Sequence, residues 1–151
     1  MARRTYIPGN FSLKVKRTPT GLGMFAGEAI PKDSCIIEYV GREISAEEAE
    51  TSRSKYLFEI TKKKTIDGKP KINPAGYLNH SCRPNAEAVI HKQRVFIFAT
   101  RAIRPGEEIV YDYGKEYTKE HCTPCLCAKC KPELHAAFAL KQRSKTPASV
   151  S

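Results

Sequence analysis

The sequence predicts a mostly β protein that forms one compact domain. Its apolar segments are short and rich in β-branched and aromatic residues, which favour strands, and proline or glycine separates most of them. Helix signals occur in only two places. A chain of 151 residues fits one domain of ordinary size, and the absence of an internal repeat argues against a solenoid.

The first strands are expected near the N-terminus. Residues 11–17 alternate apolar and basic side chains, as a half-buried strand does. Pro19 and the glycines within 21–23 are expected to break this strand. Residues 35–40 form a short β-branched segment that is typical of a buried strand.

One helix is expected early in the chain. Ser45 is a suitable N-cap residue, and Glu48 three residues later completes a capping box. Glu47 and Glu48 also place negative charge near the positive end of the helix dipole. We expect this helix to end by Arg53.

The remaining segments continue the pattern of short strands. A second helix is expected near the C-terminus, where alanine and leucine follow Pro132. The last eight residues, SKTPASVS, have the composition of a disordered tail. The expected elements are strands at 56–60, 64–67, 87–91, 94–99 and 108–113, a helical turn within 73–78, and a helix at 133–142.

The chain carries a formal net charge of +10, from 26 Lys and Arg against 16 Asp and Glu. This charge predicts attraction to DNA, RNA or nucleosomes. A solubilising surface is the alternative, because part of the excess lies in 62–64 and 141–145. The sequence has neither a secretory signal nor an apolar run of the roughly 20 residues that span a bilayer. We therefore expect a soluble intracellular protein without membrane contact, in the nucleus or the cytoplasm.

Six cysteines in such a chain suggest metal binding rather than disulfides. Four-coordinate zinc suits clustered thiolates, with reduced cysteines without metal as the alternative. Four ligands so close in sequence would strain a tetrahedron, so one ligand is expected from elsewhere. Cys35 lies in an apolar strand and is expected in the core. The clustered cysteines are Cys122, Cys125, Cys127 and Cys130.

The segment Asn79–Cys82 reads NHSC and is followed by Pro84 and Asn85. A cysteine two residues from a histidine suggests thiol catalysis, but a nucleophile and its base usually converge from separate elements. The alternative is a buried turn whose polar side chains satisfy backbone groups.

Two further segments contain candidate functional residues. Residues 106–114 (GEEIVYDYG) place Tyr111 and Tyr113 on one face of a strand, a pattern that alone indicates packing. Residues 21–26 (GLGMFA) contain a glycine pair that lets a ligand approach the backbone, but they lack the third glycine of a dinucleotide-binding motif.

Together and in this order, the segments resemble the SET-domain family of protein-lysine methyltransferases. The resemblance covers roughly residues 11–130. It implies several small curved sheets, few short helices, a threaded pseudoknot in which NHSC passes beneath a loop near the GEEIVYDYG strand, and a C-terminal zinc knuckle. The matching segments are GLGMFA at 21–26, EYVG at 38–41, YLF at 56–58, ID at 66–67, YLNHSCRPN at 77–85 and GEEIVYDYG at 106–114.

The resemblance implies S-adenosyl-L-methionine as cofactor and a protein lysine, such as one in a histone tail, as substrate. Tyr39, Tyr111 and Tyr113 match the active-site tyrosines. Tyr111 matches a position that limits product multiplicity, which implies mainly monomethylation with some dimethylation. The residues that match cofactor-binding positions are Gly21, Leu22, Gly23, Met24, Tyr56, Asn79 and His80.

The resemblance also supplies the missing zinc ligand, since in the family the cysteine of NHSC joins a C-terminal cysteine run. The implied ligands are Cys82, Cys125, Cys127 and Cys130, with Cys122 as a substitute. Two typical residues are replaced in this chain, a tryptophan by Leu22 and an arginine by Gly76.

The expected organisation is an N-terminal arm at 1–10, a SET domain at 11–117, a post-SET-like zinc-binding segment at 118–132, and a short helix with a disordered basic tail at 133–151. One alternative function is a zinc-stabilised basic chromatin- or nucleic-acid-binding module without catalysis. Another is a methyltransferase for a non-histone protein. The three tyrosines together with NHSC favour an enzyme.

Overall fold

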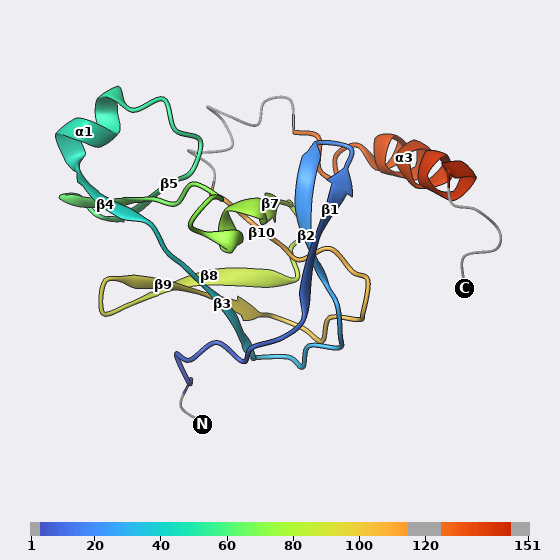
Figure 1. Cartoon of the computed structure of the whole chain (residues 1–151), viewed down its shortest axis with the longest axis horizontal. Coiled ribbons are helices and arrows are strands. Elements are labelled where there is room, and N and C mark those ends of the chain that lie inside the picture. The colour runs from blue at the N-terminus through green and yellow to red at the C-terminus, as the bar shows by residue number, and fades with distance from the viewer. Residues whose placement is uncertain (1–3, 115–124, 146–151) are drawn as a thin grey trace.

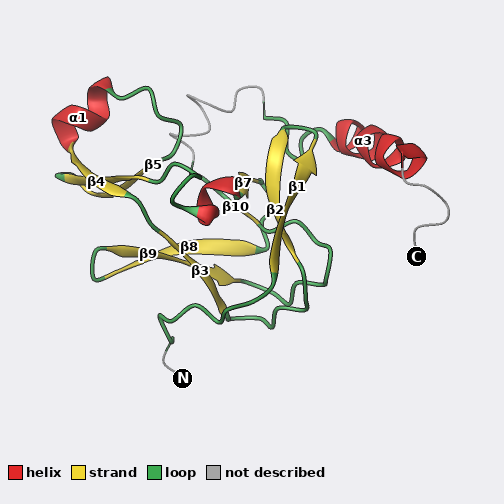
Figure 2. Ribbon diagram, in the orientation of Figure 1, coloured by secondary structure: helices red, strands yellow, loops and turns green. Residues whose placement is uncertain are grey.

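The structure is a computed structural model that describes residues 4–114 and 125–145. Within these residues the chain forms small β-sheets and few short helices (Figures 1 and 2). The helical elements are α1 (Ala46–Thr51), the 3-10 turn η1 (Pro74–Tyr77) and α3 (Pro132–Lys145). The strands are β1 (Leu13–Thr18), β2 (Gly21–Ala26), β3 (Cys35–Tyr39), β4 (Arg42–Ser45), β5 (Leu57–Thr61), β6 (Lys64–Asp67), β7 (Asn79–His80), β8 (Ala86–His91), β9 (Arg94–Ala99) and β10 (Val110–Tyr111).

The described strands divide into three sheets. The central sheet has the order β3-β9-β8-β10-β7, the β1-β2 hairpin forms a second sheet, and the third has the order β4-β6-β5. Figure 1 shows the third sheet with α1 at one end of the molecule and the hairpin with α3 at the other. The mostly β fold class expected from the sequence is confirmed.

The first strand ends before Pro19, as expected, but the expectation that the early glycines belong to the break was wrong. The chain turns at Pro19 and Thr20, and 21–26 then returns as β2, antiparallel to β1. Gly21 opens β2 with a φ of 119°, in the region that favours glycine. The glycine pair therefore begins a strand that borders the site instead of ending one.

Local sequence signals account for several other elements. Ser45 caps α1, and its side chain accepts a hydrogen bond from the Glu48 backbone N–H, which confirms the expected N-terminus. In the β8-β9 hairpin, Lys92 and Gln93 both have positive φ, as a type I′ turn requires. The strand β4 was not expected.

A crossing of two chain segments organises the central sheet. The expected strand at 108–113 contributes only β10 to this sheet, because the chain before it runs along β2: Glu108 pairs with Phe25, and the Ile109 N–H donates to the Met24 carbonyl. β10 then pairs in parallel with β7 on one side and β8 on the other. The segment 79–86 thus flanks β10 on both sides.

Asn85 fastens this crossing. The side chain is 2% exposed, accepts a hydrogen bond from the Val110 N–H at 3.0 Å and donates one to the Glu108 carbonyl at 2.8 Å. Backbone bonds add to it, since the Asn85 N–H donates to the Val110 carbonyl and the Ser81 N–H to the Tyr111 carbonyl. Asn85 therefore supplies side-chain partners for main-chain groups of two partly buried residues, Glu108 and Val110.

The main core lies between the central sheet and the segments that cover it. Val95 and Ile97 of β9 and Ile109 before β10 are each 0% exposed. On the other face of β9, Phe96 and Phe98 pack with Cys35, so the buried position expected for Cys35 is confirmed.

Several expectations fall on residues outside the described ranges. These are the position of Cys122, the domain boundary between 117 and 118, and the character of the tail from residue 146 onward. The described part of α3 is longer than the helix expected at 133–142. Among the described residues, no helix has the length and apolarity needed to cross a membrane.

Replacing Asn85 tests the crossing. Asn85→Ala leaves the partly buried Val110 N–H and Glu108 carbonyl without their side-chain partner, so we expect the free energy of unfolding to fall by about 2 to 4 kcal/mol. Urea denaturation followed by circular dichroism measures this change. Lys32→Ala on an exposed loop is the control and should change stability by less than about 0.5 kcal/mol. Equal stability of both variants would contradict the role of Asn85.

Candidate functional site

A cavity of about 950 Å³ lies where the segments of the crossing, the hairpin, the third sheet and the C-terminal cysteines meet. This volume suits a small-molecule ligand site. The residues expected from the sequence to be functional that line the cavity are Gly21, Leu22, Tyr39, Tyr56, Asn79, His80, Tyr111, Tyr113, Cys125 and Cys127.

Of the three candidate catalytic tyrosines, Tyr39 lies in β3, Tyr111 lies in β10, and Tyr113 follows β10. Tyr39 ends β3, and its hydroxyl donates a hydrogen bond to the Tyr56 carbonyl at 2.7 Å. The Tyr113 hydroxyl donates to the Leu78 carbonyl. The rings of Tyr111 and Tyr113 lie 4.9 Å apart with an interplanar angle of 58°. A phenol whose proton is held by a carbonyl can only accept a hydrogen bond from a further donor.

Gly23 and Met24 do not line the cavity. Met24 is 2% exposed in the main core, while a Cβ added at Gly23 would lie 2.5 Å from Glu108 Oε2 and 2.9 Å from Asn79 Nδ2. Gly23 therefore leaves room for a contact between two side chains that do line the cavity.

Asn79 and His80 are fixed by specific hydrogen bonds. Asn79 Nδ2 donates to the Leu22 carbonyl at 3.0 Å and to Glu108 Oε2 at 2.8 Å. His80 Nδ1 accepts from the Tyr113 backbone N–H at 3.1 Å. Burial lowers the pKa of His80, although the Asp112 carboxylate opposes this shift. The hydrogen bond requires an unprotonated Nδ1, in agreement with a neutral ring.

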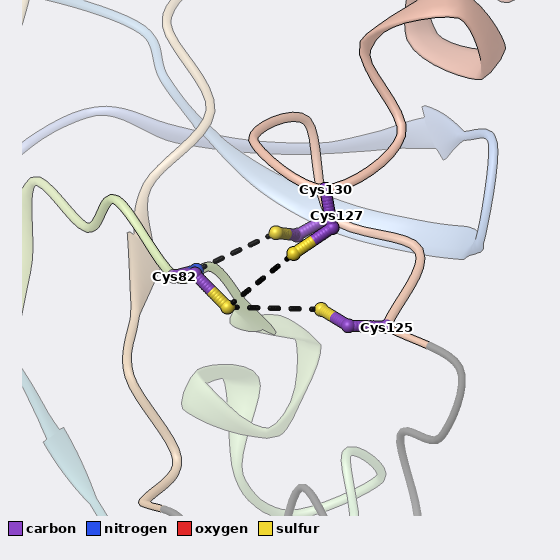
Figure 3. Close-up of side chains that lie close together, drawn as sticks. All are labelled: Cys82, Cys125, Cys127 and Cys130. Atoms are coloured by element: carbon purple, nitrogen blue, oxygen red, sulfur yellow. Dashed lines mark hydrogen bonds between the residues drawn. The ribbon is translucent and has the colours of Figure 1, made fainter.

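Four cysteines lie close together (Figure 3), and two of them, Cys125 and Cys127, line the cavity. Cys82 follows β7, whereas Cys125, Cys127 and Cys130 come from the segment before α3, more than 40 positions later. The four sulfur atoms lie within 4.8 Å of one another. Cys82 Sγ is 3.8 Å from Cys125 Sγ and 3.7 Å from Cys130 Sγ.

These distances fit a shared metal ion and not a disulfide. A disulfide bond is about 2.05 Å long. Zinc–sulfur bonds of about 2.3 Å in a tetrahedron place neighbouring sulfur atoms about 3.8 Å apart. The four cysteines could therefore hold a metal ion with little movement.

The clustered thiols shift one another's pKa values. Burial raises the pKa of Cys82 to about 12, with the neighbouring thiols adding to the shift. Burial also opposes ionisation of Cys127, but hydrogen bonds, chiefly from the backbone N–H groups of Cys82 and Cys130, outweigh it and lower its pKa to about 6. One thiolate is thus favoured while its neighbour stays protonated, and a bound cation would favour the deprotonated form of all four.

The structure does not favour a role for Cys82 as a catalytic thiol. His80 Nε2 does lie 3.3 Å from Cys82 Sγ. Cys82 nevertheless belongs to the cysteine cluster, and a raised pKa disfavours the thiolate that a nucleophile requires.

Sequence reasoning missed several charged residues of the cavity. The most informative is Glu108, whose pKa is raised by burial, while the hydrogen bond from Asn79 and the nearby His135 act against the shift. Glu108 lies within the GEEIVYDYG segment, so its place in that segment was the available signal. The other missed charged or titratable residues that line the cavity are Lys55, Tyr77, Arg83, Arg101, Glu107 and His135.

Gly76, at a position where the family typically has an arginine, also lines the cavity. A Cβ at this position would lie 2.8 Å from the Gly68 carbonyl oxygen and 3.1 Å from Pro70 Cγ. The backbone here is packed too closely to accept a larger side chain without movement.

The resemblance to the SET-domain family implied small sheets, a strand crossing, active-site tyrosines and a cysteine cluster, and the structure contains these features. Comparison with known families gives the same family. Residues 21–114, more than half of the chain, match the family described as SET domain. The chain belongs to the SET-domain family.

Similar proteins carry consistent names. The chain is 41% identical over 130 residues to "Histone-lysine N-methyltransferase, H3 lysine-4 specific" of Chaetomium globosum, a match that covers 75% of this chain and 12% of that protein. It is 35% identical over 120 residues to "Histone-lysine N-methyltransferase 2D" of Homo sapiens, covering 71% of this chain and 2% of that protein. The chain thus spans a small part of the length of these relatives.

Proposed function

We propose that this protein is an S-adenosyl-L-methionine-dependent protein-lysine N-methyltransferase. The observation that carries the proposal is the convergence of Tyr39, Tyr111 and Tyr113 on one cavity with Asn79 and His80. A noncatalytic zinc-stabilised binding module would account for the charge and the cysteines but has no need of this aromatic site. The names of the relatives support the same activity.

In this proposal the cofactor would bind on the side of the cavity next to the hairpin. The residues that would hold it are the backbone of Gly21 and Leu22, which line the cavity, with the side chains of Tyr56, Asn79 and His80. The cavity is large enough, and the Asn79 amide, with its nitrogen engaged, offers an acceptor to a charged amino group. When bound, S-adenosyl-L-methionine would supply a methyl group activated by a cationic sulfonium.

The tyrosines would favour the neutral, reactive form of the substrate lysine. Free lysine has a pKa near 10.4, so deprotonation at neutral pH costs about 4 to 5 kcal/mol. An aromatic channel with little water disfavours the ammonium and lowers this cost. Tyr113 then orients the neutral amine for in-line attack, since its proton is held by the Leu78 carbonyl and its oxygen can accept from the amine.

We infer that the metal at the cysteine cluster is zinc, bound by Cys82, Cys125, Cys127 and Cys130. Clustered thiolates favour zinc in structural sites. The ion would link the C-terminal segment to Cys82, which closely follows Asn79 and His80 in the chain. Its contribution would be structural: it would hold one wall of the cavity in place.

The substrate proposal is a histone or another basic protein tail. The relative from Chaetomium globosum is named for lysine 4 of histone H3, which makes this residue the first candidate. The net charge of +10 would not attract a basic tail by itself, but it would attract nucleosomal DNA. Contact with nucleosomal DNA would therefore complement recognition of the tail.

Incubation with labelled S-adenosyl-L-methionine tests the proposed activity. Histone octamers, nucleosomes and non-histone basic proteins would be offered, and methylated lysines mapped by mass spectrometry. Label on a defined lysine supports the proposal, and its identity separates a histone from a non-histone substrate. Cofactor binding without label on any candidate would favour another activity, and absence of cofactor binding would favour the binding-module alternative.

Cysteine variants test the metal site. We expect about one zinc ion per chain in protein purified without chelator, loss of zinc in Cys130→Ser, and retention in Cys122→Ser, which removes a thiol outside the proposed ligand set. Inductively coupled plasma mass spectrometry measures the content. Zinc-free unmodified protein would remove the proposal, and loss only in Cys122→Ser would assign a different ligand set.

Tyr113→Phe tests the positioning of the amine. We expect kcat for methyl transfer to fall by about 100-fold or more, because a misplaced nucleophile loses much of the advantage of alignment. Cofactor affinity, measured by calorimetry, should stay the same. Tyr6→Phe, at a tyrosine that stacks on His91 outside the cavity, is the control and should keep full activity. Unchanged transfer by Tyr113→Phe would exclude its proposed role.

Tyr111→Phe tests product multiplicity. We propose mainly monomethylation with some dimethylation, because the Tyr111 hydroxyl can hold the amine and oppose the rotation that a second transfer requires. Removing this oxygen should raise the fraction of dimethyl and trimethyl product. Intact-peptide mass spectrometry under multiple turnover measures the fractions. Predominant trimethylation by the unmodified enzyme would show that Tyr111 does not limit the product.

A further inference from the structure

The Asn79 side chain has its orientation dictated by two acceptors. Its nitrogen donates to the Leu22 carbonyl of β2 and to the Glu108 carboxylate, so both amide hydrogens are engaged. The opposite orientation would turn the amide oxygen toward two other oxygen acceptors. Only the orientation with the nitrogen toward β2 forms hydrogen bonds, and it leaves Oδ1 as the atom that can meet a further partner.

Glu108 is the second acceptor and is itself held in place by β2. It is partly buried beside β2, its pairing with Phe25 fixes its backbone, and its side chain reaches Asn79 at 2.8 Å. Gly23 leaves the space for this contact, because a Cβ there would meet both side chains. A carboxylate can only accept hydrogen bonds, so it holds the amide hydrogen and not the amide oxygen.

We propose that Glu108 is a positioning residue that, together with the Leu22 carbonyl, fixes the Asn79 amide with its oxygen available to the cavity. This end of the cavity then selects a ligand that carries a primary ammonium group. The proposal rests on the proposed function, since the amino-acid end of S-adenosyl-L-methionine carries such a group. Glu108 acts through Asn79 and does not itself contact the ligand.

Calorimetry with two ligands tests this selection. S-adenosylhomocysteine and its analogue without the α-amino group differ only in the ammonium. A hydrogen bond to a charged group predicts that the unmodified protein binds the first about 10- to 100-fold more tightly. Equal affinities would overturn the present proposal while leaving the cofactor proposal intact, and absence of binding by either ligand would overturn both.

Substitutions at Glu108 separate positioning from direct charge contact. Glu108→Leu removes the acceptor, so the preference for the ammonium ligand should fall by about tenfold while affinity for the analogue stays the same. Glu108→Gln keeps an oxygen that can accept from Asn79 and should retain most of the preference. Glu87→Gln, a change at an exposed carboxylate that pairs with Arg4 and does not line the cavity, is the matched control and should also retain it.

Three results would contradict the proposal. Glu108→Leu could keep the full preference, Glu108→Leu could weaken both ligands equally, or Glu108→Gln could lose as much preference as Glu108→Leu. Thermal unfolding verifies that each variant is folded. If Glu108→Leu does not fold, Gly23→Ala replaces it, because the added Cβ displaces the same pair and should reduce the preference in the same way.

Discussion

The site depends on the crossing between β10 and the segment 79–86. Because β10 pairs with β7 on one side and with β8 on the other, one loop of chain is held against both edges of a two-residue strand. The tyrosines after residue 110 and the polar side chains of Asn79 and His80 are therefore placed relative to one another by backbone hydrogen bonds. Cys82 lies on the same loop, so the crossing also presents the cysteine that meets the C-terminal segment.

Polar groups around the cavity are held mainly by main-chain partners. The Tyr39 and Tyr113 hydroxyls donate to carbonyls, and His80 accepts from a backbone N–H. Among the described residues, every buried side-chain nitrogen or oxygen has a hydrogen-bond partner. Side chains fixed in this way need little reorganisation when a ligand binds, which is the condition under which alignment contributes most to rate.

Sequence reasoning predicted the fold class, the capped helix α1 and the β8-β9 hairpin, because periodicity, capping and turn residues are local signals. It missed β4 and mistook the start of β2 for a break, because strand pairing depends on distant partners. The spacing of the C-terminal cysteines predicted a metal site, and the resemblance supplied the catalytic role of the tyrosines and Cys82 as a further ligand. It did not indicate the role of Glu108, because the contacts with Asn79 and Gly23 join residues from three separate segments.

In the proposed function, a metal ion at the cysteine cluster holds the cavity in its binding-competent form. Calorimetric titration of S-adenosyl-L-methionine into zinc-loaded and zinc-depleted protein tests it most directly, with circular dichroism to verify that the sheets persist. A cavity formed in only about a tenth of the molecules binds about tenfold more weakly. We predict a loss of at least this order on depletion and recovery when zinc is restored. Equal affinity with and without zinc, in protein that remains folded, would contradict the claim.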